Sequence, residues 1–422
     1  MTCKKVCQFS IGVDTLDKVG NRTMHSKVSG AWTYDKNNRI TQRGAGTCGS
    51  AGVTCYDWDA TGNLIKKTEG TRITQYAYDA LNRLTEIKDG ASNLIARYGY
   101  DPLNRRIWKE QYRDRAGAAL AQAKRIYYLY ADEGLIAESE QDITLNADNS
   151  VTATSSPSIS TQYGLKPGAP FMTGVLFVKT KNSNGTQSFA YYHHDHLQTP
   201  IQATDKLGNI VWSASYEAFG RATITTPKAT ATRPTISSKP RFPGQIEDEE
   251  TGLHYNWNRY YDPELGRYVT SDPIGLVGGI NTYAYLTGNP ISFIDPTGLV
   301  KHTTGREIDC GKGCWIRIDF TFDEKTGTKT RHLHWGCKGK EGECGEFGEP
   351  SHGGVWDDAP ESIKQCARKY GFQGDPAPTP KPTPSTPIPN PFIQNPDGDQ
   401  NPPKPSQGWL PLIVPILIYI LS

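Results

Sequence analysis

Carboxylates are concentrated in one short block of the chain, residues 247–272, which also contains Arg259 and Arg267. Its acids are Glu247, Asp248, Glu249, Glu250, Asp262, Glu264 and Asp272. Two carboxylates held close together can share one proton, so that one acts as general base on a water and the other as general acid. A buried arginine can orient one of them. The alternative is a solvated surface run, in which Asp262 and Asp272, both followed by proline, shape turns.

Histidines supply a second candidate site nearer the C-terminus. His332 and His334, in "HLHW", fall on one face if this stretch is a strand. With His352 and Asp357 they could bind Zn²⁺, or act as acid and base on a phosphodiester. The sequence leaves both interpretations open.

The nine cysteines are an odd number and cannot all pair within the chain. A four-cysteine zinc site in the C-terminal group would use Cys310, Cys314, Cys337 and Cys344, although their spacing is irregular. Two disulfides and one free thiol explain the five C-terminal cysteines equally well, and would suit a periplasm. Reduced thiols are the simpler interpretation of the N-terminal group, Cys3, Cys7, Cys48 and Cys55.

An internal repeat in the first third of the chain must position part of this chemistry. Its units are "WTYDKNNRITQ", "YDWDATGNLIKK", "YAYDALNRLTEI" and "YGYDPLNRRIWK". Their anchor acids are Asp35, Asp59, Asp79 and Asp101. Each unit alternates aromatic and polar residues, enters a turn rich in Asp, Asn and Gly, and leaves through Leu or Ile, which predicts a β-hairpin. Because a few such hairpins cannot bury their own hydrophobic faces, the array must pack against another surface.

A longer block follows, first as "YYHHDHLQTPIQATDKLGNIVWSASYEAFG" (191–220) and then as "RFPGQIEDEETGLHYNWNRYYDPELGRYVTSDPIGLVGGINTYAYLTGNPISFIDPTGL" (241–299). The repeat units resemble the YD repeats of Rhs proteins, and this block is similar to the Rhs repeat-associated core domain. The resemblance covers roughly residues 30–299. It implies a spiralling β-sheet that encloses a variable C-terminal toxin. Because about four repeats precede the core, we expect a partial cage.

The resemblance also implies self-cleavage in an aspartyl-protease-like manner, without a cofactor, after the Leu of a P-x4-D-P-x-G-L motif. The matching residues are Pro290, Asp295, Pro296, Gly298 and Leu299, so the expected scissile bond is Leu299–Val300. Asp272 and Asp248 are predicted as the acid pair, with Asp262 in reserve. Arg267 is predicted as the orienting cation. The alternative for "DPTGL" is a turn that closes the last strand.

The chain after Leu299 changes composition. Alternation of Ile and Phe in "WIRIDFTFD" predicts a strand, "TGTKTRHLHWG" its hairpin partner, and "DDAPESIKQCARKYG" a capped helix, so residues 300–375 form a small α+β tip. The next segment, 376–408, is proline-rich and predicted to be an extended, disordered linker. The tail 409–422 is uncharged but too short for a lone spanning helix. The sequence leaves two interpretations of this tail open: it binds a membrane surface, or it docks inside the cage as a plug.

The predicted fold class is therefore mainly β, followed by the α+β tip and the linker. The predicted segments are 1–140 (YD-repeat region), 141–189 (insertion and loop, in the form of an exposed hairpin or a loop insertion), 190–299 (core), 300–375 (toxin domain), 376–408 (linker) and 409–422 (apolar tail).

Two functions compete at the level of the sequence. The first is an Rhs-type polymorphic toxin, with a nuclease or membrane-active tip, an immunity protein as partner, and a secretion machine or chaperone for delivery. The second is a non-enzymatic surface protein that binds carbohydrate or adheres to cells. A net charge of +2 gives no general nucleic-acid signal. The N-terminus shows no apolar signal peptide, so export from the bacterial cytoplasm would need another machine.

Overall fold

The computed structural model describes residues 14–28, 30–181, 185–228, 235–299, 302–303, 308–311, 314–323, 328–337, 340–345 and 359–369. The predictions for Cys3, Cys7, Val300, His352 and Asp357, and for segments 376–408 and 409–422, lie outside these residues. Within the described ranges, no helix has the length and apolar character needed to cross a bilayer.

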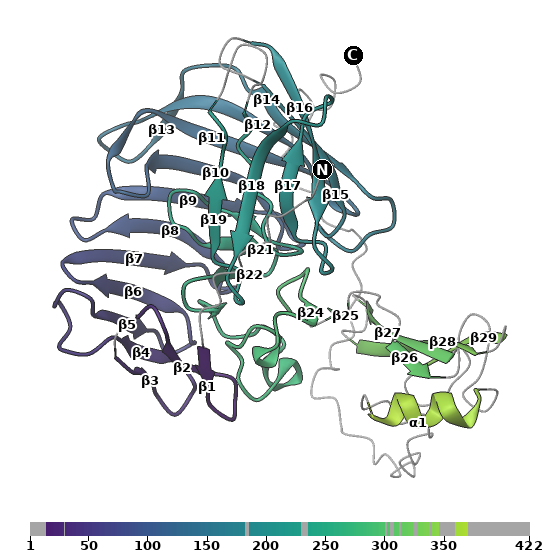
Figure 1. The fold of residues 1–422 in the computed structure, drawn as a ribbon. Helices are drawn as coiled ribbons and strands as arrows, with labels where there is room; N and C mark the ends of the chain where they lie inside the picture. The colour runs from purple at the N-terminus through teal and green to yellow at the C-terminus, as the bar shows by residue number, and fades with distance from the viewer. Residues whose placement is uncertain are drawn as a thin grey trace, which may run out of the picture. The chain divides into compact units, whose positions relative to one another are not determined.

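One antiparallel sheet contains strands β3 to β19 and curls as it grows (Figure 1). Neighbours in sequence pair along most of the sheet, and β12 pairs with both β13 and β14. The first strands are β3 (Trp32–Tyr34), β4 (Ile40–Arg43), β5 (Thr54–Trp58), β6 (Leu64–Glu69), β7 (Arg72–Tyr78), β8 (Leu84–Asp89), β9 (Leu94–Tyr100) and β10 (Arg106–Arg113). They continue as β11 (Ala119–Ala131), β12 (Gly134–Leu145), β13 (Val151–Ala153), β14 (Ser158–Leu165), β15 (Val175–Lys181), β16 (Gln187–His194), β17 (Pro200–Thr204), β18 (Ile210–Tyr216) and β19 (Ala222–Thr225). The predicted mainly β class is confirmed.

Each repeat turn is built on its aspartate. The carboxylates of Asp35, Asp79 and Asp101 accept backbone N–H groups two and four residues further on, at 2.8 to 3.0 Å. The third residue after each acid has a positive φ of about 60°, and asparagine tolerates this conformation. The "YD" signature therefore encodes the turn directly.

The turns are also connected to one another. Arg39 donates to the carbonyl of Asp59 at 3.0 Å, and Arg83 donates to the carbonyl of Asp101 at 3.2 Å. Between these two contacts, the amide of Asn63 donates to the side chain of Asn82 at 2.8 Å. We call this series the turn ladder, because each repeat holds the next through the residue four positions after its aspartate.

Residues 141–189, predicted as an insertion and loop, carry strands of the same sheet. The end of β12 forms a hairpin with β13, and β14 pairs with β12 and β15. Serine and threonine made this stretch look like a loop, but threonine also suits a pleated, half-buried strand. The β12–β13 hairpin agrees with the predicted exposed hairpin, whereas β14 and β15 are strands that the prediction did not include.

The core segment folds against the inner surface of the curl. It contains β20 (Ile246–Glu247), β21 (His254–Asn256), β22 (Arg259–Asp262), β23 (Arg267–Tyr268), the short helices η1 (Gly275–Gly278) and η2 (Leu286–Gly288), and β24 (Phe293–Ile294). Leu253, Tyr255 and Tyr260 are buried with side chains from β3 to β9. Ile246 is buried with side chains from β11 to β18. The core therefore supplies the surface on which the repeats stack.

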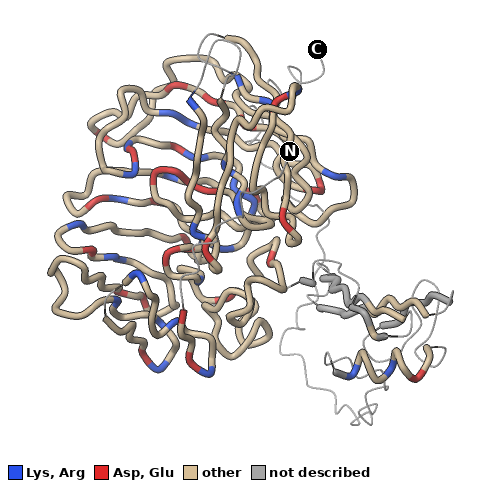
Figure 2. The backbone as a smooth tube through the Cα atoms, viewed as in Figure 1, with Lys and Arg blue, Asp and Glu red and all other residues tan. Residues whose placement is uncertain are grey.

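An N-terminal hairpin contacts both the repeat sheet and the core segment. It consists of β1 (Asp14–Leu16) and β2 (Arg22–His25). The guanidinium of Arg22 stacks over the Phe219 ring at 4.3 Å and donates to the carbonyl of Glu264 at 3.0 Å. Basic and acidic residues are interspersed along the sheet and its turns (Figure 2).

The described residues of the tip form a four-stranded antiparallel sheet and one helix. Its elements are β26 (Ile308–Gly311), β27 (Cys314–Asp323), β28 (Thr328–Cys337), β29 (Lys340–Gly345) and α1 (Glu361–Lys369). A two-residue strand, β25 (His302–Thr303), pairs with β24. Disulfides join Cys310 to Cys366 and Cys314 to Cys337.

These disulfides overturn the predicted four-cysteine metal site, because three of its four ligands are already paired. The interpretation with two disulfides in the tip is confirmed. A third disulfide joins Cys48 to Cys55, so the expectation of reduced thiols at these two positions was wrong.

Candidate functional site

Two buried aspartates and one arginine meet beside the expected scissile segment. Arg259 begins β22, Asp272 follows β23 and Asp295 follows β24. Nη2 of Arg259 lies 3.0 Å from Oδ2 of Asp272 and 3.7 Å from Oδ2 of Asp295. All three side chains are at most about 5% exposed. We call Arg259, Asp272 and Asp295 the cleavage cluster.

The chain leading to Leu299 is tied to this cluster. The backbone N–H of Leu299 donates to Oδ1 of Asp295 at 3.1 Å, and Nε of Arg259 donates to the carbonyl of Gly298. Asn258 donates from its backbone N–H and its side-chain amide to the carbonyl of Thr297, at 3.2 and 3.1 Å. Three successive residues of "DPTGL" are thus held in place.

Gly298 is required by this arrangement. Its φ is +72°, and a Cβ there would lie 2.4 Å from the carbonyl oxygen of Asn256. Glycine adopts positive φ without steric cost and lets the two backbones approach. The Gly of the motif therefore places the Leu299 N–H against Asp295.

Tyr268 completes the surroundings of Asp295. Its hydroxyl donates to Oδ2 of Asp295 at 2.7 Å, and the Arg259 guanidinium lies 3.6 Å from the centre of its ring. Burial raises the pKa of Tyr268 well above its ordinary value, and the Asp295 carboxylate raises it further. The hydroxyl therefore keeps its proton and acts as a hydrogen-bond donor.

The loop after β23 approaches Asp272 closely. The backbone N–H of Ile274 donates to Oδ1 of Asp272 at 3.1 Å, and a Cβ on Gly278 would lie 2.4 Å from Oδ2. The segment 272–278 therefore wraps the carboxylate and leaves no room for a side chain at position 278.

Asp248, predicted as the partner of Asp272, belongs to a different set of charges. Its carboxylate accepts from Arg106 at 2.5 Å and from Lys109 at 2.9 Å, and Lys109 also donates to Glu250 at 2.9 Å. We call Arg106, Lys109, Asp248 and Glu250 the anchor cluster. Burial alone would raise the pKa of Asp248, but the Arg106 and Lys109 cations hold it below its ordinary value.

Arg267, predicted as the orienting cation, also has other partners. It donates to the carbonyl of Asn38 and to the side chain of Asn21, and lies between the rings of Tyr34 and Tyr283. Arg259 is the guanidinium that contacts Asp272. The structure thus brings Asp295, Asp272 and Arg259 together, and it does not bring together the predicted grouping of Asp248, Asp272 and Arg267.

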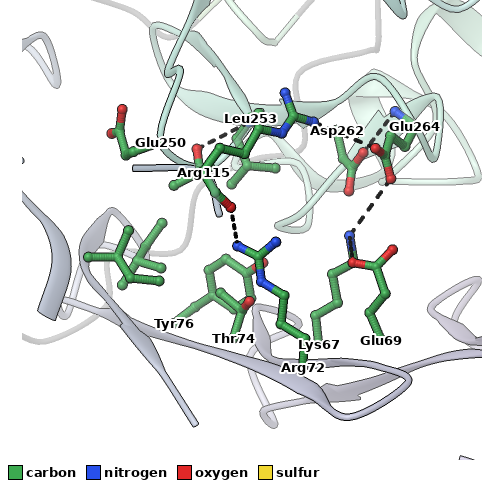
Figure 3. A pocket seen from close by; sticks show the side chains of 14 residues that line it. Lys67, Glu69, Arg72, Thr74, Tyr76, Arg115, Glu250, Leu253, Asp262 and Glu264 are labelled. Atoms are coloured by element: carbon green, nitrogen blue, oxygen red, sulfur yellow. Dashed lines mark hydrogen bonds and ion pairs between the residues drawn. The ribbon is translucent and has the colours of Figure 1, made fainter. Parts of the chain in front are cut away.

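Asp262, the reserve candidate, faces a polar cavity of about 110 Å³ between the repeat sheet and the core. Lys67, Arg115 and Glu264 line the same cavity (Figure 3). The carboxylate of Asp262 accepts the backbone N–H groups of Glu264 and Leu265, at 2.9 and 3.1 Å. Burial raises the pKa of Asp262. The contacts of Asp262 therefore fix a turn and a cavity wall.

A sequence signal for the proximity of Asp272 and Asp295 did exist. Asp272 and Asp295 each begin a D-P-x-G-L stretch, "DPIGL" and "DPTGL". Asp295 was predicted as part of the cut motif, but its repetition of the Asp272 context was not used. The histidine candidates His332 and His334 both lie on β28, and His334 is partly buried.

The pattern of the family described as RHS protein matches residues 189–225, and that of the RHS Repeat matches residues 58–94. The chain is 34% identical over 260 residues to the Double-stranded DNA deaminase toxin A of Burkholderia cenocepacia, which covers 58% of this chain and 17% of that protein. It is 32% identical over 265 residues to the Toxin protein Tse5 of Pseudomonas aeruginosa, which covers 58% of this chain and 19% of that protein.

A third relative is the Probable deoxyribonuclease RhsA of Dickeya dadantii, 28% identical over 303 residues, which covers 69% of this chain and 19% of that protein. A solved structure of TcdB2-TccC3 without its hypervariable C-terminal region aligns with a TM-score of 0.40 at 16% identity, over 68% of this chain and 17% of that one.

The chain spans less than a fifth of the length of these relatives. The repeat hairpins and the core that follows them define a β scaffold built from YD repeats. The chain belongs to the Rhs/YD-repeat family and contains an Rhs repeat-associated core domain.

Proposed function

We propose that this chain is an Rhs-type toxin whose scaffold cuts its own backbone between Leu299 and Val300, and so separates the tip from the core. One observation carries the proposal: the Leu299 N–H is bonded to Asp295, and Arg259 bridges Asp295 to Asp272 within 4 Å. An acid pair and an orienting cation thus lie beside the peptide bond that the motif designates.

The charges of the cleavage cluster suit shared acid–base work. With both carboxylates ionised, the buried trio would carry one net negative charge, which burial disfavours. One proton shared by the pair makes the trio neutral. The ionised carboxylate removes a proton from water, and the water oxygen bonds to the Leu299 carbonyl carbon. The protonated acid then gives its proton to the Val300 nitrogen as the C–N bond breaks.

Hydrogen bonds to the backbone hold the expected scissile segment in place beside the two acids. Arg259 and Asn258 fix the carbonyls of Gly298 and Thr297, so the residues before the bond cannot shift relative to the acids. Holding reactants in the reactive geometry removes much of the entropic cost of the step. No cofactor is needed in this scheme.

The test is intact-mass analysis and a denaturing gel of the purified full chain. We expect a cut after Leu299 in the natural sequence and a single uncut chain in Asp272→Asn and in Asp295→Asn. Asp57→Asn is the matched control, because Asp57 is exposed and its removal should leave cleavage unchanged.

Two outcomes would overturn this assignment. One is a cut at the same bond in either variant of the pair. The other is an uncut natural chain that has folded, which would favour the non-enzymatic binding function.

The biological setting is part of the same proposal. Relatives named as toxins support a role as a delivered toxin. Such a role calls for an immunity protein that binds the tip and for a delivery machine or chaperone. Co-expression of a neighbouring small protein that restores growth would identify the first of these partners.

A further inference from the structure

The apolar core of the tip is small and contains several cysteines. In the described residues, the large apolar side chains of this core are Ile316, Leu333, Trp335 and Ile363. The cysteines of the same cluster are Cys314, Cys337 and Cys366, which are buried, and Cys310, which packs against them. Paired cysteines are therefore as numerous in this cluster as large apolar side chains.

The two tip disulfides connect different elements of the cluster. Cys314 of β27 is bonded to Cys337 of β28, its direct partner in the strand register, 23 residues further on. Cys310 of β26 is bonded to Cys366 of α1, 56 residues further on. A covalent link removes conformations from the unfolded chain, and this effect grows with the length of the closed segment. Both bonds therefore favour the folded tip, and the Cys310–Cys366 bond should favour it more.

The attachment of helix α1 to the sheet depends on one of these bonds. The helix has nine residues, and a helix this short is not stable in water without packing. Its buried side chains are Ile363, Cys366 and Ala367, at the spacing i, i+3 and i+4 that defines one helix face. The disulfide to Cys310 thus belongs to the face that packs on the sheet. Without this bond, two apolar side chains and a free thiol would have to hold α1.

A domain of this size usually needs such links. Residues 300–375 were predicted as the tip domain, and chains of fewer than about 80 residues rarely fold stably on an apolar core alone. Thiol-reducing systems keep cysteines unpaired in the cytoplasm, whereas disulfides form and persist in a periplasm. The stability of the tip should therefore differ between these two compartments.

We propose that the tip folds only when its two disulfides form, so that it is inactive in the reducing cytoplasm that produces it and becomes active in an oxidising compartment such as a periplasm. The partner that this step requires is a protein disulfide that takes up electrons from thiols. The inference rests on the proposed function only in that the tip is the toxic part. The folding step itself does not depend on self-cleavage.

Each bond forms through two thiol–disulfide exchanges. A tip thiol loses its proton, and the thiolate attacks one sulfur of the oxidant disulfide and displaces the other sulfur as a thiolate. The second tip thiolate then attacks the tip sulfur of this mixed disulfide and displaces the remaining oxidant sulfur. The tip cysteines lose two electrons, and the oxidant is reduced to two thiols. The two protons released by the tip balance those taken up by the oxidant.

Burial protects the bonds once the tip has folded. Cys314, Cys337 and Cys366 are 3%, 7% and 9% exposed. Exchange requires that a thiolate reach a disulfide sulfur, so external thiols should reduce the folded tip slowly. The oxidised tip should therefore keep its fold after it leaves the compartment in which it was oxidised.

The third disulfide provides a comparison within the same chain. Cys48 and Cys55 are seven residues apart, and Cys55 lies on β5. The neighbouring residues Ile40 and Tyr56 are buried in the large cluster that the repeat sheet shares with the core segment. A short closed segment stabilises less than a long one, and the scaffold has an extensive apolar core of its own. We expect the scaffold to fold in both redox states.

The test is amide hydrogen exchange of the full chain, purified from a reducing cytoplasm without contact with an oxidant. Before oxidation, β27 and β28 should exchange as unfolded segments, while β9 and β10 stay protected. After addition of glutathione disulfide, protection of β27 and β28 should rise at least about 30-fold for each bond formed. Intact mass counts the bonds and also scores the Leu299 cut in the same samples.

Paired substitutions separate the contributions of the bonds. In the oxidised chain, Cys310→Ser with Cys366→Ser should lower protection of the tip strands more than Cys314→Ser with Cys337→Ser, because it opens the longer segment. Cys48→Ser with Cys55→Ser is the matched control. It removes a disulfide outside the tip, so tip protection should stay unchanged.

Growth of cells that express the full chain, with and without an added signal peptide, tests the consequence. We expect slow growth only for the exported chain, and its loss when all four tip cysteines are replaced by serine. Equal protection of β27 and β28 in the reduced and oxidised chains would overturn the inference, as would equal growth loss from both compartments. A tip that folds on oxidation but harms neither compartment would support the redox step and would instead contradict the toxic role in the proposed function.

Discussion

The core contains two buried charge clusters that look alike but differ in what they touch. The anchor cluster joins Arg106 on the repeat sheet to Asp248 in the core segment. The cleavage cluster joins Arg259 to two acids and also holds the carbonyl of Gly298. Burial and charge pairing are common to both. Contact with the expected scissile segment distinguishes the cluster for which we propose a catalytic role from the anchor cluster.

The environment of Arg106 shows why the anchor cluster is structural. Its guanidinium lies within 5.8 Å of the ring centres of Tyr98, Tyr128, Tyr255 and Tyr260, and Tyr255 and Tyr260 belong to the core segment. An arginine enclosed by rings from two layers fixes their spacing. Arg259 instead has one ring beneath it and donates its N–H groups to carbonyls and acids.

The largest expected effect is on stability, and it tests whether the anchor cluster holds the repeat sheet to the core segment. Arg106→Met leaves Asp248 buried with a single partner, which should lower the free energy of unfolding by about 3–5 kcal/mol. Urea unfolding of the full chain, in an Asp272→Asn background that keeps one species, measures it. Arg72→Met, at an exposed position, should cost less than about 1 kcal/mol. Equal losses in the two variants would contradict the anchor role.

The next effect concerns rate. Arg259→Lys removes the planar fork that contacts Asp272, Gly298 and Thr282 together, so self-cleavage should slow by about 100-fold. Arg267→Lys is the matched control, and we expect its rate to stay within about threefold. A time course of the gel shift decides between them. A larger loss of cleavage rate in the Arg267 variant would instead support Arg267 as the orienting cation, as predicted from the sequence.

A third effect appears as pH falls. The folded-state pKa of Asp248 lies below its ordinary value of 3.8, because Arg106 and Lys109 outweigh burial. The stabilisation is therefore complete above pH 3.8 and is lost as pH falls through the folded-state pKa. Asp248→Asn should reduce the slope of unfolding free energy against pH by up to about 1.4 kcal/mol per unit. Chemical unfolding at several values below pH 4 tests this; an unchanged slope would contradict it.

The smallest expected effect is the loss of stability when an acid in a repeat turn is replaced, and it is compared with the loss at a buried charge pair. Asp79→Asn keeps an acceptor for the turn but loses the charge pair with Arg83, whose side chain is 22% exposed. We expect a loss of less than about 1 kcal/mol, since partly exposed ion pairs contribute little. Thermal unfolding in parallel with Arg106→Met provides the measurement. A loss as large as that of the buried arginine would show that burial does not govern these pairs.

The fold was predictable where the signal was local. An aspartate that bonds the N–H groups two and four residues ahead identifies its own hairpin, so the repeats were found from "YD" and the turn residues. Residues 141–189 lack that signature, and their strands β14 and β15 were missed because serine and threonine occur in both loops and strands.

The site was predictable only in part, because its members meet through long-range register. Asp272 and the bond after Leu299 followed from motifs. The choice of Arg259 over Arg267 depends on how β22 and β23 lie against the "DPTGL" segment, which no local pattern reveals. The tip disulfides could be counted but not assigned, since five cysteines allow many pairings.

The turn ladder has a consequence for how such genes change in length. In the turn ladder, each repeat is hydrogen-bonded to the next through one side chain. The last turn contacts the core through Trp257, whose indole N–H donates to the carbonyl of Leu103 at 2.9 Å. Recombination that duplicates or deletes one whole unit upstream of Asp101 restores equivalent contacts at the new junction. We therefore expect in-frame exchange between similar DNA segments to change the number of repeats, whereas loss of the final unit would remove its contact with the core.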